Sequence, residues 1–321
     1  MEHQPRIAAV VVTYNRPALL LSCLESIQAQ SKLPDEIFII DNKSAAETQE
    51  LLRTHGYVAG DAPQHTELGL SYQTRVQARH GELAITYLYK HENDGGAGGF
   101  YAGMRLAYDA GYDWLWMMDD DGLTDADELA ELLDKCCKYD IPYANALVIS
   151  STDHRHLSFP NKKYTLTSQL DGLDIVTDLF SPFNGTFIRR DVIDRIGMIK
   201  REMFIWGDEV EYSRRVAKGG FKSATVCTAK HYHPTSRSEK MYICPFLPIP
   251  GTRIVVKVAS GRSRIFYRNR GYIYATYHSK IVFWRWLLYN TIAYATRLRL
   301  KEVGTLFKYA LRGARNDFRL D

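Results

Sequence analysis

The chain has 321 residues, of which 45% are hydrophobic and 24% charged, as in ordinary globular proteins. This length suits one large α/β domain with an appendage, or two small domains, and the composition excludes a disordered or low-complexity chain. The net charge of +4 conceals an asymmetry: residues 251–321 carry 15 Lys and Arg against 3 Asp and Glu, whereas the other 250 residues carry 26 against 34. We therefore expect an acidic body and a basic C-terminal region that faces an anionic surface.

The five cysteines are odd in number and include no CxxC pair, which favours a reduced, cytoplasmic protein. The first six residues are polar and lead directly into an apolar run, so no signal peptide is expected.

Strands and helices are predicted to alternate over the first 140 residues. Residues 7–13 form a continuous β-branched run that is typical of a strand covered on both faces. Further strands are predicted at 36–40, 84–90 and 113–118, and helices at 18–29, 44–55, 98–110 and 125–138. This alternation implies an α/β fold with a mostly parallel sheet and right-handed crossovers. Residues 57–82 are polar and contain glycine, which predicts an irregular insertion.

The second half of the chain has a different pattern. Short strands are predicted at 144–150, 183–189 and 221–230, with a helix at 208–218. Three prolines and a glycine between positions 245 and 251 indicate a linker. We therefore predict a catalytic domain at 1–240, a linker at 241–263 and a helical, basic region at 264–321.

Three consecutive aspartates, Asp119-Asp120-Asp121, follow the apolar run 114–118 and precede Gly122. Three carboxylates at the end of a buried strand repel one another, and a divalent cation would neutralise them. Oxygen ligands on a short loop suit Mg²⁺ or Mn²⁺, ions that commonly bridge to substrate phosphates. The alternative interpretation is an acidic loop on a solvated surface.

Polar side chains follow each of the first four predicted strands. Thr13, Asp41, Asn93 and the aspartate triplet all lie at such ends, where open α/β sheets bind their ligands. Asp41 alone could equally be a helix cap or a turn residue.

The glycine run 95–99 follows the third strand and opens a helix. Glycines such as Gly96 let backbone amides approach a phosphate or a sugar, and a helix N-terminus favours anions. The run lacks the spacing of a dinucleotide fingerprint, because Tyr101 stands at the position of the third glycine. A simple tight turn is the alternative.

Two acids, Asp208 and Glu209, open a predicted helix after Trp206. Glu209 is the candidate general base, with Asp208 as the alternative, and helix capping is the non-catalytic interpretation of both. Trp206 offers an apolar face to a sugar ring. His231 and His233 are candidate metal ligands or phosphate contacts, although either could be an ordinary surface or core histidine.

Taken in order, these segments resemble the inverting family 2 glycosyltransferases of the GT-A fold. The resemblance rests on Val11-Val12-Thr13-Tyr14-Asn15-Arg16, Ile40-Asp41-Asn42, Asp119-Asp120-Asp121 and Trp206-Gly207-Asp208-Glu209. Within the family, Asn93–Phe100 together with Met118–Asp121 most resembles bacterial galactofuranosyltransferases, and rhamnosyltransferases of polysaccharide assembly are similar. Tyr267-Arg268-Asn269 matches an element that follows the catalytic domain in both groups. Gly207 departs from the pattern, since an aromatic or acidic residue is common there.

The resemblance implies a role for each candidate residue. Donor-binding residues are Thr13, Asp41, Asn93, Gly96, Asp119 and Asp120; metal ligands are Asp119, Asp121 and His233, with His231 as second choice; the base is Glu209 or Asp208; and the acceptor side holds Trp206 and Asn184. The expected cofactor is Mn²⁺ or Mg²⁺.

The implied function is transfer of galactofuranose from UDP-galactofuranose to a saccharide acceptor, expected to be lipid-linked, in the synthesis of a cell-surface polysaccharide such as O-antigen. Transfer of rhamnose from a dTDP-linked donor is the alternative within the fold. From another class, the alternative is a non-catalytic module that binds nucleotide sugars or glycans.

Residues 281–300 mix apolar, aromatic and basic side chains, and the charges leave no apolar run long enough to span a bilayer. This pattern suits an interfacial helix on anionic lipid, so we expect peripheral contact with the inner face of the cell membrane. A helical packing domain or an oligomer interface is the alternative. No nucleic-acid-binding motif is found, and no nucleic-acid partner is expected.

Overall fold

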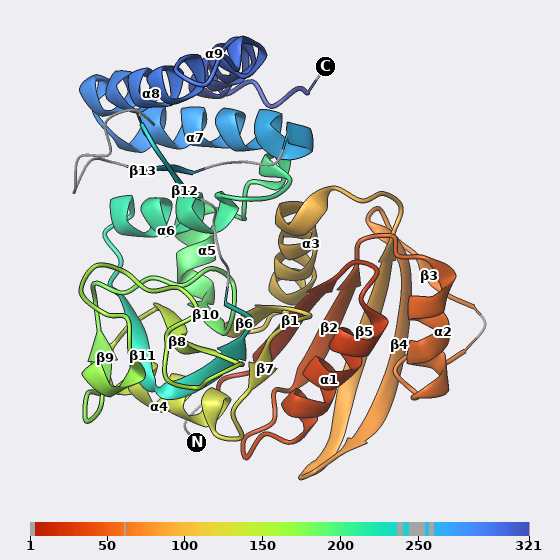
Figure 1. Cartoon of the computed structure of the whole chain (residues 1–321). Helices are drawn as coiled ribbons and strands as arrows, with labels where there is room; N and C mark the ends of the chain where they lie inside the picture. Colours follow the sequence, from red (N-terminus) through yellow and green to blue (C-terminus); the bar gives the residue numbers. More distant parts are fainter. Residues whose placement is uncertain (1–3, 61, 236–239, 244–253, 257–259, 321) are drawn as a thin grey trace. The chain divides into compact units, whose positions relative to one another are not determined.

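The computed structural model describes residues 4–60, 62–235, 240–243, 254–256 and 260–320. The chain forms two compact units, which Figure 1 shows in sequence colours. The first unit comprises residues 1–201 and 215–236, and the second comprises 202–214 and 237–321. Most of the linker expected at 241–263 lies outside the described residues.

The strands are β1 (Ile7–Thr13), β2 (Glu36–Asp41), β3 (Gln64–His65), β4 (Gly69–Ala78), β5 (Gly81–Lys90), β6 (Trp114–Asp119), β7 (Leu123–Thr124), β8 (Tyr143–Ser150), β9 (Ile175–Val176), β10 (Thr186–Arg189), β11 (Ser223–His233), β12 (Lys240–Tyr242) and β13 (Ile254–Val256). The α-helices are α1 (Pro17–Gln28), α2 (Ala46–Thr54), α3 (Gly95–Asp109), α4 (Glu128–Tyr139), α5 (Arg190–Ile196), α6 (Asp208–Lys218), α7 (Ser263–Tyr277), α8 (Lys280–Ala295) and α9 (Leu300–Ala314). Short 3₁₀ helices are η1 (Thr167–Gln169), η2 (Arg201–Met203) and η3 (Ser260–Arg262).

The first unit is built on one large sheet with strand order β3-β4-β5-β2-β1-β6-β10-β8-β11-β7, and β9 pairs with β11. Its centre, β5-β2-β1-β6, is parallel, as the alternating pattern predicted. The register sets Thr13 opposite Asp41, and Val12 opposite Asp119. The carboxyl ends of these three strands therefore meet at one edge of the sheet.

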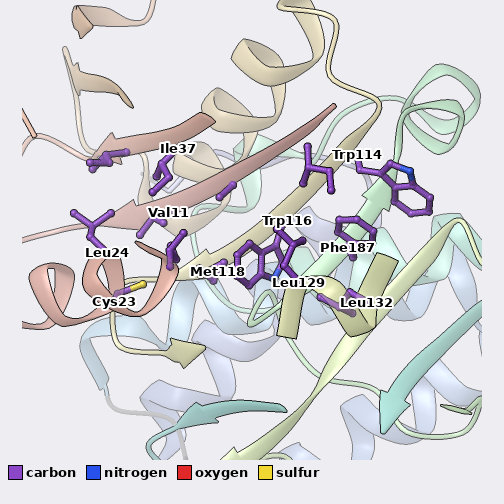
Figure 2. Packing of buried hydrophobic residues seen from close by; sticks show 14 of the residues in the cluster. Val11, Cys23, Leu24, Ile37, Trp114, Trp116, Met118, Leu129, Leu132 and Phe187 are labelled. Carbon is purple, nitrogen blue, oxygen red and sulfur yellow. The ribbon is translucent and has the colours of Figure 1, made fainter. Parts of the chain in front are cut away.

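Strand β1 is buried along its whole length because helices cover both of its faces. Val11 packs with Leu24 of α1 in the main core, part of which is shown in Figure 2. Val10 faces α3 on the opposite side, where a Cβ at Gly103 would overlap its side chain. Glycine thus lets α3 lie close to the strand, which brings the helix N-terminus to the edge of the sheet.

The segment 57–82 was expected to be irregular, but it contains the ten-residue strand β4, which forms an antiparallel hairpin with β5. Tyr72, Thr74 and Val76 alternate with polar residues along β4, a period of two that indicates a half-buried strand. The strand prediction at 183–189 was also too long, because β10 begins only at Thr186. Gly185 has a φ of 70°, so the chain turns immediately before this strand.

The second unit is helical, as predicted for the chain after residue 264, with α7 packed on α8 and α9 around a small aromatic core. Helices α7 and α9 approach closely, since a Cβ at Gly271 would meet the backbone of Ala310 and one at Gly313 the backbone of Arg268. Within the described part of the chain, none of the helices combines the length and the apolar character that crossing a bilayer requires.

Candidate active site

Side-chain contacts join the end of β1 to the aspartate triplet at the end of β6. Oγ1 of Thr13 donates a 2.6 Å hydrogen bond to Oδ2 of Asp120. Nη1 of Arg16 lies 3.1 Å from Oδ1 of Asp120 and 2.7 Å from Oδ2 of Asp121. A positive φ at Asn15 turns the chain between the strand and α1, which begins at Pro17. The sequence analysis missed Arg16 as a partner of the triplet.

The two carboxylates held by Arg16 have different electrostatic environments. Burial raises the pKa of Asp120 to about 6, although the hydrogen bond from Thr13 and the charge of Arg16 act in the opposite direction. Burial also acts to raise the pKa of Asp121, but His233 and Arg16 outweigh it and hold this pKa below its ordinary value. Asp121 is therefore the carboxylate that stays ionised most readily.

The two histidines of β11 have different neighbours. Nε2 of His233 lies 3.2 Å from Oδ1 of Asp121. His231 is fully buried, and its Nδ1 lies 3.1 Å and 3.2 Å from the carboxylate oxygens of Glu128. The structure thus places His233, the first choice of the sequence analysis, beside the aspartate triplet.

Glu128 is a buried carboxylate that sequence reasoning missed. It accepts a 3.1 Å hydrogen bond from Nε1 of Trp116, and burial raises its pKa despite that bond and the contact with His231. Nε2 of His231 has no hydrogen-bond partner among the described residues, and a Cβ at Gly122 would overlap it. The imidazole therefore packs directly against the glycine that ends the aspartate loop.

Asp41 lies at the end of β2 and is fully buried. One of its carboxylate oxygens accepts a 2.6 Å hydrogen bond from the amide of Ser44, and the other accepts a 2.8 Å bond from the hydroxyl of Tyr87. Burial raises the pKa of Asp41 in spite of these donors. Its contact with a nucleotide stays a prediction.

A buried lysine that the sequence analysis missed supports the glycine-rich start of α3. Nζ of Lys90 donates to Oδ1 of Asn42 at 3.0 Å and to Asp94, which also lies 3.3 Å from Nη2 of Arg201. Burial lowers the pKa of Lys90 although Asp94 acts to raise it. The sequence marks this lysine by its position at the end of the apolar strand β5 and by the acid four residues further on, Asp94.

The predicted donor-binding residues near α3 lie at its first turn. Oδ1 of Asn93 accepts a 2.9 Å hydrogen bond from the amide of Gly95. A Cβ at Gly96 would meet no atom within 4 Å, so the backbone there faces open space. This opening is compatible with the close approach of a ligand to the helix N-terminus.

Asn184 precedes β10 in the first unit and is buried. Its Oδ1 has no hydrogen-bond partner among the described residues. The expected role of Asn184 on the acceptor side stays a prediction.

Trp206, Asp208 and Glu209 belong to the second unit. Asp208 and Glu209 form the first turn of α6, and Oε2 of Glu209 accepts a 3.1 Å hydrogen bond from the amide of Gly207. The ring of Trp206 is partly exposed and has the guanidinium of Arg262 5.5 Å from its centre. Glu209 thus forms a local capping contact, as the non-catalytic interpretation expected.

The side chains near the aspartate triplet supply part of the ligand set that a divalent cation needs. No group of three or more His, Cys, Asp and Glu side chains suited to holding a metal is present in the residues that the structure covers. Asp121 and His233 nevertheless offer an oxygen and a nitrogen that face each other, and their contact lacks hydrogen-bond geometry. Two protein ligands suit an ion that completes its shell with substrate oxygens and water.

Some known proteins are similar to this chain in sequence, and some solved structures are similar to it in fold. Residues 5–244 match a family described as "Glycosyltransferase like family 2". The chain is 32% identical to galactofuranosyltransferase GlfT1 of Mycolicibacterium smegmatis, over 85% of this chain and 84% of that protein. It is 31% identical to GlfT1 of Mycobacterium tuberculosis, over 96% of this chain and 98% of that protein.

Among solved structures, the chain is similar to TarS of S. aureus, with a TM-score of 0.52 and 11% identity over 95% of this chain and 55% of that one. TarS 1–349 in complex with UDP gives a TM-score of 0.51 at 12% identity, over 98% of this chain and 94% of that one. The fold is thus of the GT-A type. The protein belongs to the family 2 glycosyltransferases, and it is a glycosyltransferase enzyme.

Proposed function

We propose that the enzyme transfers galactofuranose from UDP-galactofuranose to a hydroxyl group of a saccharide acceptor. The observation that carries this proposal is the similarity to GlfT1, which extends over nearly the full length of both chains. Because that relative is named a galactofuranosyltransferase, we favour a galactofuranose donor over a rhamnose donor. The two acids at the start of α6 support catalysis over simple binding of a nucleotide sugar.

The donor would lie along the carboxyl edge of the parallel strands. The first turn of α3 presents backbone amides and an open position at Gly96, which suits phosphate oxygens. Lys90 supports this turn through its hydrogen bond to Asp94, and Thr13 orients Asp120 through a hydrogen bond of its own. Asp41, Asn93 and Asp119 complete the proposed contacts with the nucleotide. A UDP complex of the fold relative TarS is in keeping with such a donor.

Asp121 and His233 would hold Mn²⁺ or Mg²⁺, with Asp119 as a further candidate ligand. A bound divalent ion would supply neutralisation of the charge that develops on the departing diphosphate. The low pKa of Asp121 supports this assignment, because an ionised carboxylate is available to the ion at neutral pH. Arg16 occupies the other oxygen of the same group and keeps it in place.

Glu209 would take the proton from the acceptor hydroxyl, with Asp208 as the alternative base. The hydroxyl oxygen forms a bond to the anomeric carbon of the donor while the bond from that carbon to the phosphate oxygen breaks. UDP leaves with the bonding electron pair, and a single displacement inverts the anomeric configuration. Trp206 would offer its ring to the acceptor sugar, and Asn184 would offer the amide oxygen that has no partner within the described ranges.

The exposed surface of α8 supports an acceptor that is linked to a lipid. Ile281, Trp284, Leu288 and Ile292 recur at helical spacing and are all exposed, the first by 75%. Basic residues Lys280 and Arg285 flank them. We propose that this exposed stripe of α8 contacts the anionic inner face of the cell membrane, where a lipid-linked saccharide would be found.

The test is a screen of nucleotide sugars with the full-length enzyme, Mn²⁺ and a short galactofuranose-containing acceptor, read by mass spectrometry. We expect UDP-galactofuranose to give an acceptor larger by one hexose. Turnover of dTDP-rhamnose in place of UDP-galactofuranose would establish the rhamnosyltransferase alternative. Binding of UDP without hydrolysis or transfer of any donor would indicate a non-catalytic binding module.

A further inference from the structure

The Tyr267-Arg268-Asn269 element of α7 is wholly buried in the second unit. Nδ2 of Asn269 lies within hydrogen-bond distance of three backbone carbonyl oxygens, those of Met203 (2.8 Å), Ile205 (3.0 Å) and Trp206 (2.9 Å). One amide nitrogen carries two protons, so the three carbonyls share them. The three acceptors all belong to the segment that leads into α6, which we call the 203–207 loop.

Arg268 fixes the orientation of this amide and adds a further bond to the same loop. Its Nε donates to Oδ1 of Asn269 at 3.1 Å, so Nδ2 must face the loop. Its Nη2 donates to the carbonyl of Met203 at 2.9 Å, and its Nη1 to that of Phe318. Burial lowers the pKa of Arg268 to about 10, which leaves the guanidinium charged at neutral pH.

The 203–207 loop needs such support because its backbone is unusual. Phe204 and Trp206 have φ angles of 66° and 64°, values that bulky L-residues rarely adopt. Gly207 has a φ of 103°, and a Cβ there would lie 3.1 Å from Ile273 of α7. A backbone held in such a conformation persists only when its surroundings fix it.

The loop ends directly at the two acids of the proposed base. Gly207 donates from its amide to the carboxylate of Glu209, and its carbonyl accepts from the amide of Glu211 one turn further on. A shift of the loop would therefore shift the first turn of α6, together with the ring of Trp206.

We infer that Arg268 and Asn269 are positioning residues that hold the 203–207 loop, and through it Trp206, Asp208 and Glu209, in the arrangement required for proton transfer from the acceptor. This inference rests on the proposed function of Glu209. It gives the C-terminal helices a part in catalysis that is separate from any contact with a membrane.

The test compares Asn269→Asp with a matched variant on the same helix, Tyr267→Phe. Asn269→Asp replaces the donating amide by a carboxylate that faces three carbonyls, while Oδ1 can still accept from Arg268. Tyr267→Phe removes a buried hydrogen bond of the same helix, from the hydroxyl of Tyr267 to that of Tyr294 at 2.6 Å. Both changes disturb the core of the second unit, but only Asn269→Asp acts on the loop.

We expect Asn269→Asp to lower kcat about 100-fold, since a displacement near 1 Å of a catalytic group costs a factor of that order. The Kd for UDP with Mn²⁺, measured by calorimetry, should change less than about twofold, whereas Tyr267→Phe should keep kcat within about threefold of the wild type. Arg268→Lys, which keeps the charge but loses the fork of donors, should show an intermediate loss of kcat.

Hydrogen exchange of the 203–209 peptide gives a readout that needs no activity. Faster exchange in Asn269→Asp than in Tyr267→Phe, at equal Tm, would support the inference, and equal exchange in the two variants would overturn it. A kcat of Asn269→Asp equal to that of Tyr267→Phe would also overturn it. If Asn269→Asp fails to fold, Arg268→Lys decides by the same two measurements.

The two hypotheses fail in different ways. A wild-type enzyme that turns over no UDP-galactofuranose would contradict the proposed donor, while the exchange measurement still decides whether the loop is held. Full activity of Glu209→Gln and of Asp208→Asn would contradict the role of the loop in proton transfer.

Discussion

Nε2 of His233 lies 3.2 Å from Oδ1 of Asp121. The other oxygen of the same carboxylate is 2.7 Å from Nη1 of Arg16, so Asp121 has a nitrogen group on each side. Asp121 therefore stays ionised, and its Oδ1 lies next to the imidazole of His233, which could bind the same metal ion.

Removal of divalent ions should abolish transfer, and added Mn²⁺ or Mg²⁺ should restore it. Asp121→Asn should weaken the joint binding of Mn²⁺ and UDP at least tenfold, because it removes the charged oxygen ligand. Calorimetry of UDP binding with and without Mn²⁺ measures this. Asp127→Asn, an exposed change at the start of α4, is the control and should bind as the wild type. Full turnover in the presence of a chelator would contradict metal dependence.

Glu209→Gln should reduce transfer by about 10²–10⁴-fold, since an amide of the same shape cannot accept the acceptor proton. Binding of UDP should be unchanged, as the predicted donor residues belong to the first unit. Asp208→Asn provides the matched comparison. An active Glu209→Gln enzyme together with an inactive Asp208→Asn enzyme would move the base by one residue.

Gly122→Ala should destabilise the fold by about 1–3 kcal/mol, because the added methyl group overlaps the imidazole of His231. His231 cannot move aside freely, as Glu128 holds its Nδ1. Thermal unfolding of Gly122→Ala, His231→Ser and the double variant forms a cycle that measures the coupling. Gly304→Ala on α9, where a Cβ meets nothing within 4 Å, should be neutral or stabilising.

The overlap predicts that the double variant is less destabilised than the sum of the two single changes. Strictly additive losses would show that the glycine and the histidine do not constrain each other.

Lys90→Met should cost about 3 kcal/mol of stability, because it leaves Oδ1 of Asn42 unpaired and removes the buried partner of Asp94. Chemical denaturation measures the change in the free energy of unfolding. Lys163→Met is the control: this exposed lysine forms a surface pair with Asp178, and its loss should change stability far less than the loss of Lys90. Equal effects of the two changes would mean that the buried network contributes little.

Trp284→Glu combined with Leu288→Glu should reduce sedimentation of the full-length enzyme with anionic vesicles, since both residues belong to the exposed stripe of α8. Leu166→Glu combined with Leu173→Glu, at two exposed leucines of the first unit, is the charge-matched control. Unchanged sedimentation of the double variant, or none of the wild type, would contradict the membrane contact. Conversion of a dimer to a monomer, seen by light scattering, would instead assign the stripe to an oligomer interface.

The elements that sequence patterns predicted best are those with a continuous and unmixed signal. Residues 7–13 form a strand with the predicted bounds, and 208–218 form the predicted helix. Strand β4 was missed because its apolar residues alternate with charged and amide side chains, so composition alone suggested a loop. Short elements such as β7 and α5 carry too few residues to show a period.

The candidate site likewise contains residues whose positions the sequence pattern predicted and others that it did not. The carboxyl-edge positions of Thr13 and Asp119–Asp121 follow from parallel strand order, which the sequence pattern indicated. Partners such as Glu128 and His231 are 103 positions apart, and nothing in either local sequence indicates the other. Arg16 was missed for this reason, because Asp120 and Asp121 are 104 and 105 positions away. Lys90 has an acidic partner only four positions away, Asp94, but its burial against Asn42 follows from the fold alone.

Strand β11 changes register against β8 between Val226 and Lys230, which pair with the adjacent residues Ala146 and Leu147. Three residues of β11 are thus left over in the bulge, and an odd number reverses the alternation of side chains. This reversal turns His231 to the side of the sheet that holds Glu128. Beyond the bulge, the pairing with β8 sets the face on which both histidines of this strand lie, so a slip of that pairing by one residue would turn both to the opposite face without altering either of them.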